Sequence, residues 1–134
     1  EQIIAAILHD TLEDTDYSQE ELVEEFGNEI AQIVVACTED SRIVDADERK
    51  VKLLEQISAF EPARIVKAAD SLSNMTDLLT ALKEKGSSFW ARFHGGKDRK
   101  IDYFSDIFHI AQESMPLSMQ EEYYQTLKSL EKMG

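Results

Sequence analysis

The sequence predicts an all-α protein, and three observations lead to that prediction. Apolar residues recur with helical spacing along nearly the whole chain. Only five Gly and two Pro interrupt this pattern, and no stretch alternates convincingly between apolar and polar residues as a half-exposed strand would. The chain has 134 residues, a length that suits one domain with a single core. We therefore expect residues 1–134 to form a single compact helical bundle.

Capping residues set the expected helix boundaries in the N-terminal part of the chain. A first helix covers about residues 1–9 and could continue through Asp14. The capping-box pattern Ser18-Gln19-Glu20-Glu21 opens a second helix, which Gly27 ends. Asn28 can cap a third helix. The inward face of this third helix is expected to carry Ile30, Ile33, Val34 and Cys37.

The middle of the chain is expected to form a loop and then two helices. Residues 38–47 are polar and irregular, which indicates a loop. A helix follows over about residues 48–60. Its inner side is expected to carry Val51, Leu54, Ile57 and Ser58. Pro62 suits the first turn of a long helix over about residues 63–85. The apolar positions of the long helix are Ile65, Val66, Ala69, Leu72, Met75, Leu78, Leu79 and Leu82.

The C-terminal part is expected to form a connection and two further helices. Gly86-Ser87-Ser88 ends the long helix, and residues 89–96 form a connection with Trp90 and Phe93 as apolar anchors. The last two helices cover about residues 98–114 and 118–132. Pro116 separates them, and the second opens with another capping-box pattern.

The charge balance makes several partners unfavourable. The chain carries 27 acidic and 14 basic side chains, a net charge of −13, and so repels phosphate backbones and anionic membranes. No apolar run approaches the roughly 18–20 residues that a membrane span needs. A single Cys37 cannot form an internal disulfide, which suits a cytoplasmic location. We expect neither a nucleic-acid nor a membrane partner.

Two short segments carry the residues that suit chemistry. In the first, one imidazole and three carboxylates follow the apolar run 3–8: His9, Asp10, Glu13 and Asp14. Acidic groups at the C-terminal end of a helix oppose its dipole, at about 0.3–1 kcal/mol each on a surface. A bound divalent cation would offset that repulsion. The alternative is an acidic helix end that is simply exposed to water.

The second segment lies on the long predicted helix. Asp70 and Asn74 are four residues apart and therefore share a helix face. Since the neighbouring positions are apolar, we expect Asp70 to be partly buried and to supply a metal ligand from a second helix. The alternative is a pair of polar side chains that face water. Lys67 could pair with Asp70, but we expect its long stem to reach solvent instead.

Both segments resemble motifs of one protein family. Ala6-Ile7-Leu8-His9-Asp10-Thr11-Leu12-Glu13-Asp14-Thr15 resembles the central motif of HD-domain phosphohydrolases. Within them it resembles the subgroup that hydrolyses guanosine tetraphosphate, which includes the hydrolase half of Rel/SpoT enzymes and the small metazoan SpoT homologue. Val66 to Met75 resembles the second motif of that subgroup, and similar residues recur in 26–27, 34–35, 38–40 and 48–50. The resemblance implies an HD-domain helical bundle.

The resemblance also implies roles for particular residues. His9, Asp10 and Asp70 are implied as ligands of a divalent metal, by preference Mn²⁺. Glu13 and Asp14 are implied as the catalytic acidic pair.

Three further residues are implied to contact the substrate. Asn74 is expected to touch the substrate or a water at the metal. Arg99 and Tyr103 fall where the small homologues contact the substrate, and their spacing places both on one helix face. For Arg99 a plain solvated cation in Lys97-Asp98-Arg99-Lys100 is an equal alternative.

The sequence departs from the family pattern at three places. The family has an additional His ligand on a helix before the central motif, and this sequence begins too late to contain it. Because Glu1-Gln2-Ile3-Ile4 reads like the middle of a helix, we expect N-terminal helices to be missing. The subgroup often has a Lys where this chain has Asp45-Ala46-Asp47, and many relatives have a basic residue at Ser71. The last two changes remove positive charge near the expected polyphosphate.

The predicted function is therefore metal-dependent phosphohydrolysis of a small nucleotide. The preferred activity resembles that of a guanosine-3′,5′-bis(diphosphate) 3′-pyrophosphohydrolase, in which water activated at a His- and Asp-bound metal attacks a pyrophosphate group. Two alternatives stay open. One is an HD phosphohydrolase that acts on a different nucleotide or phosphate ester, and the other is a catalytically silent HD domain that senses a nucleotide.

Overall fold

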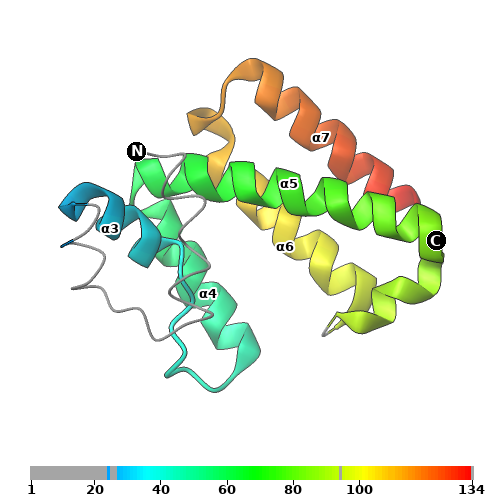
Figure 1. Cartoon of the computed structure of the whole chain (residues 1–134), viewed down its shortest axis with the longest axis horizontal. Coiled ribbons are helices and arrows are strands. Elements are labelled where there is room, and N and C mark those ends of the chain that lie inside the picture. Colours follow the sequence, from blue (N-terminus) through cyan, green and yellow to red (C-terminus); the bar gives the residue numbers. More distant parts are fainter. Residues whose placement is uncertain (1–23, 25–26, 94, 134) are drawn as a thin grey trace. The chain divides into compact units, whose positions relative to one another are not determined.

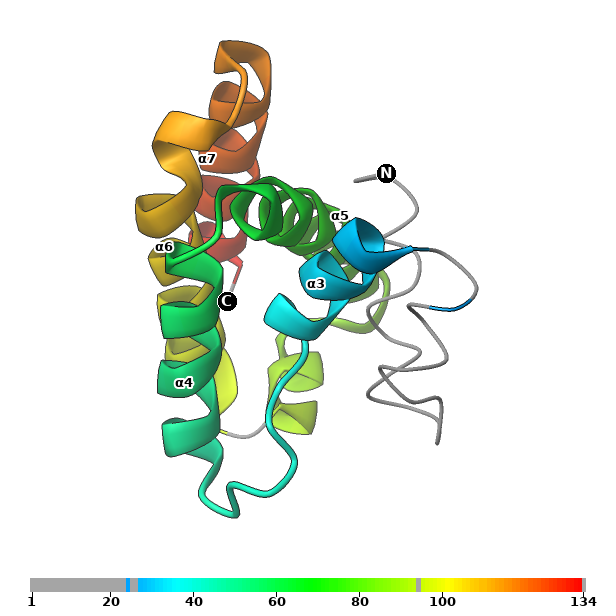
Figure 2. The ribbon, with the colours of Figure 1, turned by 90° about the vertical axis from the view of Figure 1, so that its left-hand side faces the viewer.

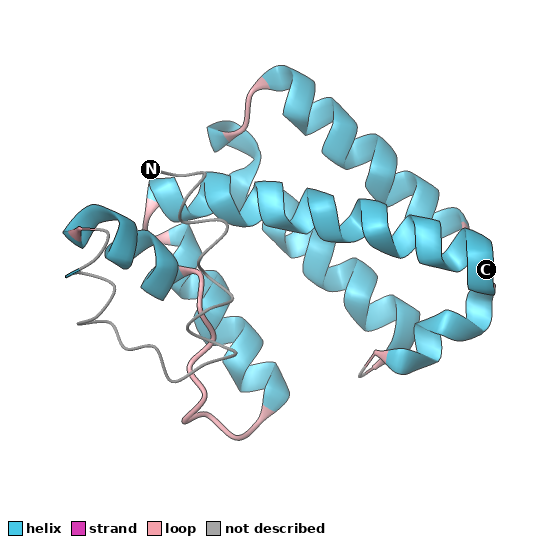
Figure 3. Ribbon diagram, viewed as in Figure 1, coloured by secondary structure: helices cyan, strands magenta, loops and turns pink. Residues whose placement is uncertain are grey.

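The computed structural model describes residues 24, 27–93 and 95–133, and all of the structure below refers to these residues. They form helices and short connections without a strand, so the all-α prediction is confirmed (Figures 1 and 3). The α-helices are α3 (Asn28–Ala36), α4 (Ala46–Ser58), α5 (Glu61–Lys85), α6 (Gly96–Ala111) and α7 (Leu117–Lys132). Two 3-10 helices, η1 (Ser87–Arg92) and η2 (Gln112–Ser114), flank α6. The helices expected over 1–9 and 18–26 lie outside this described part.

The chain divides into two compact units, with the boundary inside α5 between Lys67 and Ala68. None of the described helices is both long enough and apolar enough to cross a membrane. The expectation of a single domain over residues 1–134 stays a prediction.

In the first unit, α3 packs against the first turns of α5 (Figure 2). The face predicted for α3 is confirmed, since its four apolar residues are all at least 93% buried. The core of this unit consists of Ile30, Ala31, Ile33, Val34, Cys37, Ala63 and Val66. The Cys37 thiol donates a hydrogen bond to the Ala63 carbonyl oxygen at 3.7 Å, which joins the end of α3 to α5.

Helix α4 starts earlier and faces differently than expected. The Asp45 carboxylate accepts hydrogen bonds from the backbone N–H groups of Asp47 and Glu48 at 2.8 and 3.0 Å, so the helix begins at Ala46. Leu53 and Ile57 form its buried face. Val51 is 57% exposed, so the predicted inner side is wrong at this position, and also at Ser58, which is exposed as well. Adjacent leucines at positions 53 and 54 allow two alternative apolar faces. Packing buries the face with Leu53 rather than the predicted face with Leu54.

Two further expectations, for Ala69 and Lys67 on α5, are wrong. Ala69 is exposed, although the apolar pattern includes it. Lys67 is only 8% exposed and does not extend into solvent as expected. Its neighbours Val66 and Ala68 are also buried, so α5 is covered on more than one side at these positions. The helix then ends at Lys85, and Gly86 follows with φ of +84°, which confirms the predicted stop.

In the second unit, α6 and α7 pack against each other after the sharp turn at η2 (Figure 1). The Tyr123 hydroxyl donates a hydrogen bond of 2.6 Å to the Phe104 carbonyl oxygen inside this core. The segment expected to be an irregular connection contains η1 instead. Trp90 is confirmed as an anchor, because it is 5% exposed and its indole N–H reaches the Met133 carbonyl oxygen at 3.3 Å.

Candidate functional site

The predicted central motif lies outside the described residues. This applies to the expected metal ligands His9 and Asp10 and to the expected catalytic pair Glu13 and Asp14, whose roles stay predictions. Among the residues that the structure does describe, no three His, Cys, Asp or Glu side chains are grouped to hold a metal ion.

Asp70 and Asn74 lie one turn apart on α5 and contact each other. Asp70 is half-buried, as predicted, and Asn74 is exposed. The Asn74 amide nitrogen donates a hydrogen bond to Asp70 Oδ2 at 3.4 Å, which is long for such a bond. Carboxylate oxygens are ligands that divalent cations take in proteins, and the Asp70 carboxylate is half-buried on α5. The donor chemistry of Asp70 therefore fits a divalent metal.

Ser71, the residue that departs from the family pattern, is part of the core. It is 1% exposed and its side chain hydrogen-bonds to the Tyr123 hydroxyl. Burial raises the pKa of Tyr123 far above its usual range, the bond with Ser71 opposes that rise, and the charge interaction with Tyr103 adds to it. A long basic side chain would not fit this buried position without displacing Tyr123. The burial of position 71 beside Tyr123 thus accounts for a small side chain there in this chain.

Arg99 and Tyr103 share one face of α6, as their spacing predicts. Arg99 Nη2 and the Tyr103 hydroxyl oxygen are both buried, so a fully solvated Arg99 is the wrong alternative. The stem of Arg99 folds back over Gly95, where an added Cβ would lie 2.1 Å from Arg99 Cδ. Gly95 also has φ of +80°, a conformation that residues with a side chain rarely adopt. Position 95 therefore requires Gly for two reasons: its backbone conformation, and the space that the Arg99 side chain occupies beside it.

A pocket of about 450 Å³ lies within the second unit, between α5, the η1 segment and α6. Its lining is mainly apolar and includes three aromatic rings. The lining residues are Asn74, Asp77, Leu78, Ala81, Phe89, Phe93, Lys100 and Phe104. The pocket includes Asn74, a predicted substrate contact, whereas Arg99 and Tyr103 do not line it. Such a size and lining are typical of small-molecule sites.

Cations lie over the aromatic rings of this pocket. The Lys100 ammonium is 4.8 Å from the centre of the Phe93 ring and 5.4 Å from that of Phe104. Lys85 and Arg92 lie 5.3 and 4.9 Å from the centre of the Phe89 ring. These distances are those of cation–π interactions. The segment that supplies them is therefore both aromatic and basic.

Sequence reasoning missed most of this pocket, although a signal is present. Six of the 14 basic residues lie between positions 83 and 100, where only two acidic residues occur. Three aromatic residues are interspersed among them. Phe93 was expected only as an apolar anchor, yet it is half-buried and lines the pocket.

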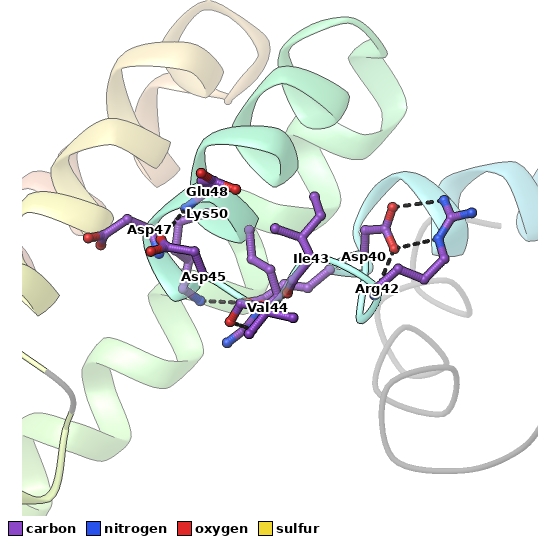
Figure 4. A network of polar contacts seen from close by, with 10 residues as sticks. Asp40, Arg42, Ile43, Val44, Asp45, Asp47, Glu48 and Lys50 are labelled. Atoms are coloured by element: carbon purple, nitrogen blue, oxygen red, sulfur yellow. Dashed lines mark hydrogen bonds and ion pairs between the residues drawn. The ribbon is translucent and has the colours of Figure 1, made fainter.

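A second polar network holds the connection between α3 and α4. Glu39 accepts hydrogen bonds from Arg49 Nε at 3.2 Å and Lys50 Nζ at 2.5 Å. Burial raises the pKa of the Glu39 carboxyl, but these two cations outweigh burial and the pKa is lowered overall. Asp40 and Arg42 form a two-bond ion pair in the same connection, and Arg42 lowers the pKa of Asp40 to about 2 (Figure 4). This network joins residues 38–40 to residues 48–50, two segments for which the sequence resembles the family.

Comparisons with known proteins agree with the predicted family. A family model described as an HD domain matches residues 1–98. Guanosine-3′,5′-bis(diphosphate) 3′-pyrophosphohydrolase MESH1 of Danio rerio is 41% identical over 78 residues, which are 58% of this chain and 43% of that protein. The guanosine-3′,5′-bis(diphosphate) 3′-pyrophosphohydrolase of Aquifex aeolicus is 40% identical over 88 residues, 63% of this chain and 13% of that one. The matches thus span less than half the length of either relative.

A solved structure extends the likeness along the chain. The crystal structure of lmo0812 from Listeria monocytogenes EGD-e superposes with a TM-score of 0.83 at 28% sequence identity. The match covers 98% of this chain and 85% of that one. Because the HD-domain model also matches well over half of the residues, the chain belongs to the HD domain family.

Proposed function

We propose that this protein is a metal-dependent phosphohydrolase that removes pyrophosphate from the 3′ position of guanosine-3′,5′-bis(diphosphate). The observation that carries the proposal is the half-buried Asp70 carboxylate with Asn74 one turn along α5, in a chain of the HD domain family. Two relatives at about two-fifths identity are named for this activity. The substrate is a small nucleotide, and a cytoplasmic location stays a prediction from composition.

His9, Asp10 and Asp70 would hold the divalent cation, with Mn²⁺ preferred. A ligand set of one imidazole and two carboxylates suits Mn²⁺ better than it suits an ion that prefers oxygen ligands alone. When bound, such an ion lowers the pKa of a water ligand and offsets negative charge on phosphoryl oxygens. Asp70 is the member of this set that the structure describes, and its half-buried carboxylate is compatible with that role.

The other residues would orient the substrate and move the proton. Glu13 and Asp14 would accept the proton of the attacking water, a contribution typically worth about 10²–10⁴-fold in rate. The Asn74 amide would donate to a phosphate oxygen or a water. Arg99 and Tyr103, one turn apart on α6, would contact the substrate, as the resemblance implies. The products would be a nucleoside diphosphate and pyrophosphate.

A different nucleotide or phosphate ester is the second candidate substrate. It is favoured by the acidic segment Asp45–Asp47 and by Ser71, which both lack the positive charge found in many relatives. In that case the same residues would perform the same hydrolysis on another phosphoryl group. A silent nucleotide-sensing domain would bind the nucleotide without turnover.

Turnover of guanosine tetraphosphate with Mn²⁺ tests the proposal. Pyrophosphate release should require the metal, should stop with EDTA, and should be lost in Asp70→Ala together with Mn²⁺ retention. Glu84→Ala is the matched control, since it removes an exposed carboxylate from the far end of the same helix. Normal turnover by Asp70→Ala would refute the metal assignment. Hydrolysis of other nucleotides in the same assay, without hydrolysis of guanosine tetraphosphate, would favour the second candidate substrate.

A companion variant separates catalysis from metal binding. Glu13→Gln keeps the three proposed ligands, so it should retain Mn²⁺ while losing about 10²-fold or more in rate. Loss of Mn²⁺ in this variant would instead identify Glu13 as a ligand. Mn²⁺ content is measured by electron paramagnetic resonance on the same samples used for the rate assay.

A further inference from the structure

We propose that the Tyr123 hydroxyl of α7 is a positioning group, which holds α5 and α6 in the relative placement that the proposed hydrolysis needs. The inference rests on the proposed function and deepens it, since α5 carries Asp70 and Asn74. Helix α6 carries Arg99 and Tyr103, and all of these residues lie in the second unit. The residues that the HD-domain model matches end at position 98. Tyr123 therefore acts on the family motif from a later part of the chain.

Two hydrogen bonds place the Tyr123 hydroxyl between α5 and α6. Its O–H group donates to the Phe104 carbonyl oxygen of α6 at 2.6 Å. A phenol has a single proton to donate, so the hydrogen bond with the Ser71 side chain of α5 uses a lone pair of the Tyr123 oxygen. Ser71 is therefore the donor in that bond. One oxygen atom thus connects three helices through one donated and one accepted hydrogen bond.

Burial prevents water from replacing either hydrogen bond. Tyr123 is fully buried, and Ser71 is 1% exposed. Burial also raises the pKa of Tyr123 far above its usual range, so the hydroxyl keeps its proton and remains a donor to the Phe104 carbonyl oxygen. The connection between α5 and α6 is therefore fixed in direction and does not change with pH near neutrality.

Both hydrogen-bond partners of Tyr123 are next to predicted site residues. Ser71 directly follows Asp70, the predicted metal ligand, and Phe104 directly follows Tyr103, a predicted substrate contact. Tyr103 also raises the pKa of Tyr123 through a charge interaction, which requires the two phenol groups to lie near each other. A shift of α6 against α5 would move the substrate contacts relative to the metal ligand. A misplacement of about 1 Å can lower a rate about 10²-fold.

The surroundings of Tyr123 favour positioning over a direct part in the reaction. Its hydroxyl is fully buried, and its proton is donated to a backbone carbonyl oxygen rather than to a ligand. The ring packs on Phe108, with ring centres 5.3 Å apart. Tyr123→Phe would therefore keep the packing of the ring and remove only the two hydrogen bonds.

Steady-state kinetics of Tyr123→Phe with guanosine tetraphosphate and Mn²⁺ test the inference. We expect kcat/KM to fall about 10-fold or more, because the substrate contacts on α6 are misplaced. The Mn²⁺ dissociation constant should not change, since no proposed ligand is removed. The pH profile of kcat should keep its shape, because the hydroxyl does not titrate near neutrality, whereas loss of a group that transfers a proton would change it.

Tyr124→Phe is the matched control. Tyr124 is the next residue on α7 and is 47% exposed, so its variant loses a hydroxyl from the surface rather than from the core. It should keep the kcat/KM of the wild type. Leu130→Ala is a second control, because it truncates a fully buried side chain of α7 without removing a hydrogen bond of Tyr123. It should lower stability but keep kcat/KM when rates are referred to the folded fraction, measured by circular dichroism.

Two double-mutant cycles separate positioning from a general loss of stability. Ser71→Ala and Tyr123→Phe break the same hydrogen bond, so the double variant should lose little more kcat/KM than Tyr123→Phe alone. In an Arg99→Ala background, Tyr123→Phe should also have little further effect, because the contact that it positions is already absent. A purely structural role would give additive losses with Arg99→Ala.

Three results would overturn the inference. They are an unchanged kcat/KM in folded Tyr123→Phe, an equal loss in Tyr124→Phe, and additive losses in both cycles. If the wild type releases pyrophosphate and Tyr123→Phe matches it, the proposed function stands and the positioning role falls.

Failure of the proposed function gives a different result. If the wild type releases no pyrophosphate, the proposed hydrolysis falls, and the variants are compared by their dissociation constants for guanosine tetraphosphate from isothermal titration calorimetry. Weaker binding by Tyr123→Phe, but not by Tyr124→Phe, would then support the positioning role alone. Equal dissociation constants, or no binding by the wild type, would overturn it.

Discussion

The connection between α3 and α4 and the connection between α5 and α6 stabilise their helices by different means. In the first, carboxylates pair with nearby cations and cap a helix, as Glu39 does with Lys50 and as Asp45 does at the start of α4. In the second, cations lie over aromatic rings, as Lys100 does over Phe93. The first connection satisfies its charges internally. The second holds its cations at the wall of a pocket.

This difference indicates where function can reside on the described part of the chain. Glu39 already has two cationic partners, so its charge is compensated within the protein. A cation over an aromatic ring at the wall of a pocket adds its positive charge to that pocket. We therefore expect changes in the α3–α4 connection to alter stability alone, and changes in the α5–α6 connection to alter nucleotide binding as well.

Trp90→Ala should have the largest effect on stability. Trp90 is almost fully buried and bonds to the Met133 carbonyl oxygen, so its truncation leaves a large cavity. We expect the free energy of unfolding to fall by about 3–5 kcal/mol, measured by urea denaturation. Trp90→Phe should lose much less, since it retains most of the apolar volume. A loss below about 1 kcal/mol for Trp90→Ala would show that the connection has another anchor.

Gly95→Ala tests whether Gly95 is needed to position the Arg99 side chain. The variant must accept a left-handed backbone and displace the Arg99 stem, and we expect a loss of about 1–3 kcal/mol with a raised KM for the nucleotide. Gly86→Ala is the control in the same connection, because it has a similar φ but no atom within 4 Å of the added Cβ. It should lose stability without a change in KM. Identical behaviour of the two variants would contradict a positioning role for Gly95.

Asp45→Ala probes the cap of the other connection. Its carboxylate accepts two backbone hydrogen bonds at the start of α4, so the loss should be about 1 kcal/mol in the free energy of unfolding. Asp45→Asn keeps an acceptor and should lose only a fraction of that. Both variants remove the same negative charge and differ only in the cap, so guanosine diphosphate should bind to both with the same affinity. A lower affinity in Asp45→Ala than in Asp45→Asn would contradict the proposed division between the two connections.

Glu39→Gln should have the smallest effect, and that effect depends on pH. Because the pKa of Glu39 is lowered in the folded state, its contribution is present above its usual pKa of 4.5 and is lost as pH falls through the lower folded value. At pH 7 we expect a loss of about 0.2–1 kcal/mol for a partly exposed pair. Urea denaturation at pH 7 and below pH 4 measures the difference between variant and wild type. A difference in unfolding free energy between variant and wild type that grows as the pH falls would contradict this prediction.

Local signals account for much of the fold. Gly86 ends α5 where the sequence predicts, and the buried face of α3 follows from the helical spacing of Ile30, Ile33 and Val34. The start of α4 could not be placed by composition, because a run of charged residues hides the cap formed by Asp45. The face of α4 depends on packing against other elements, which periodicity does not contain.

The candidate site divides in a similar way. The pair Asp70 and Asn74 follows from helical spacing, and the structure brings its two side chains into contact. The pocket does not follow from spacing, because Phe89, Phe93 and Phe104 converge only when different elements pack together. Helical periodicity describes one element at a time, so a site built from three elements is visible only as a local excess of cations and aromatic residues.

Hydrogen–deuterium exchange of the intact protein, with and without saturating guanosine diphosphate, tests the division between the two connections most directly. We expect slower exchange of backbone amides over residues 86–100 when the nucleotide is bound, and no change over residues 38–45. Protection confined to residues 38–45, or no protection in either connection, would contradict it.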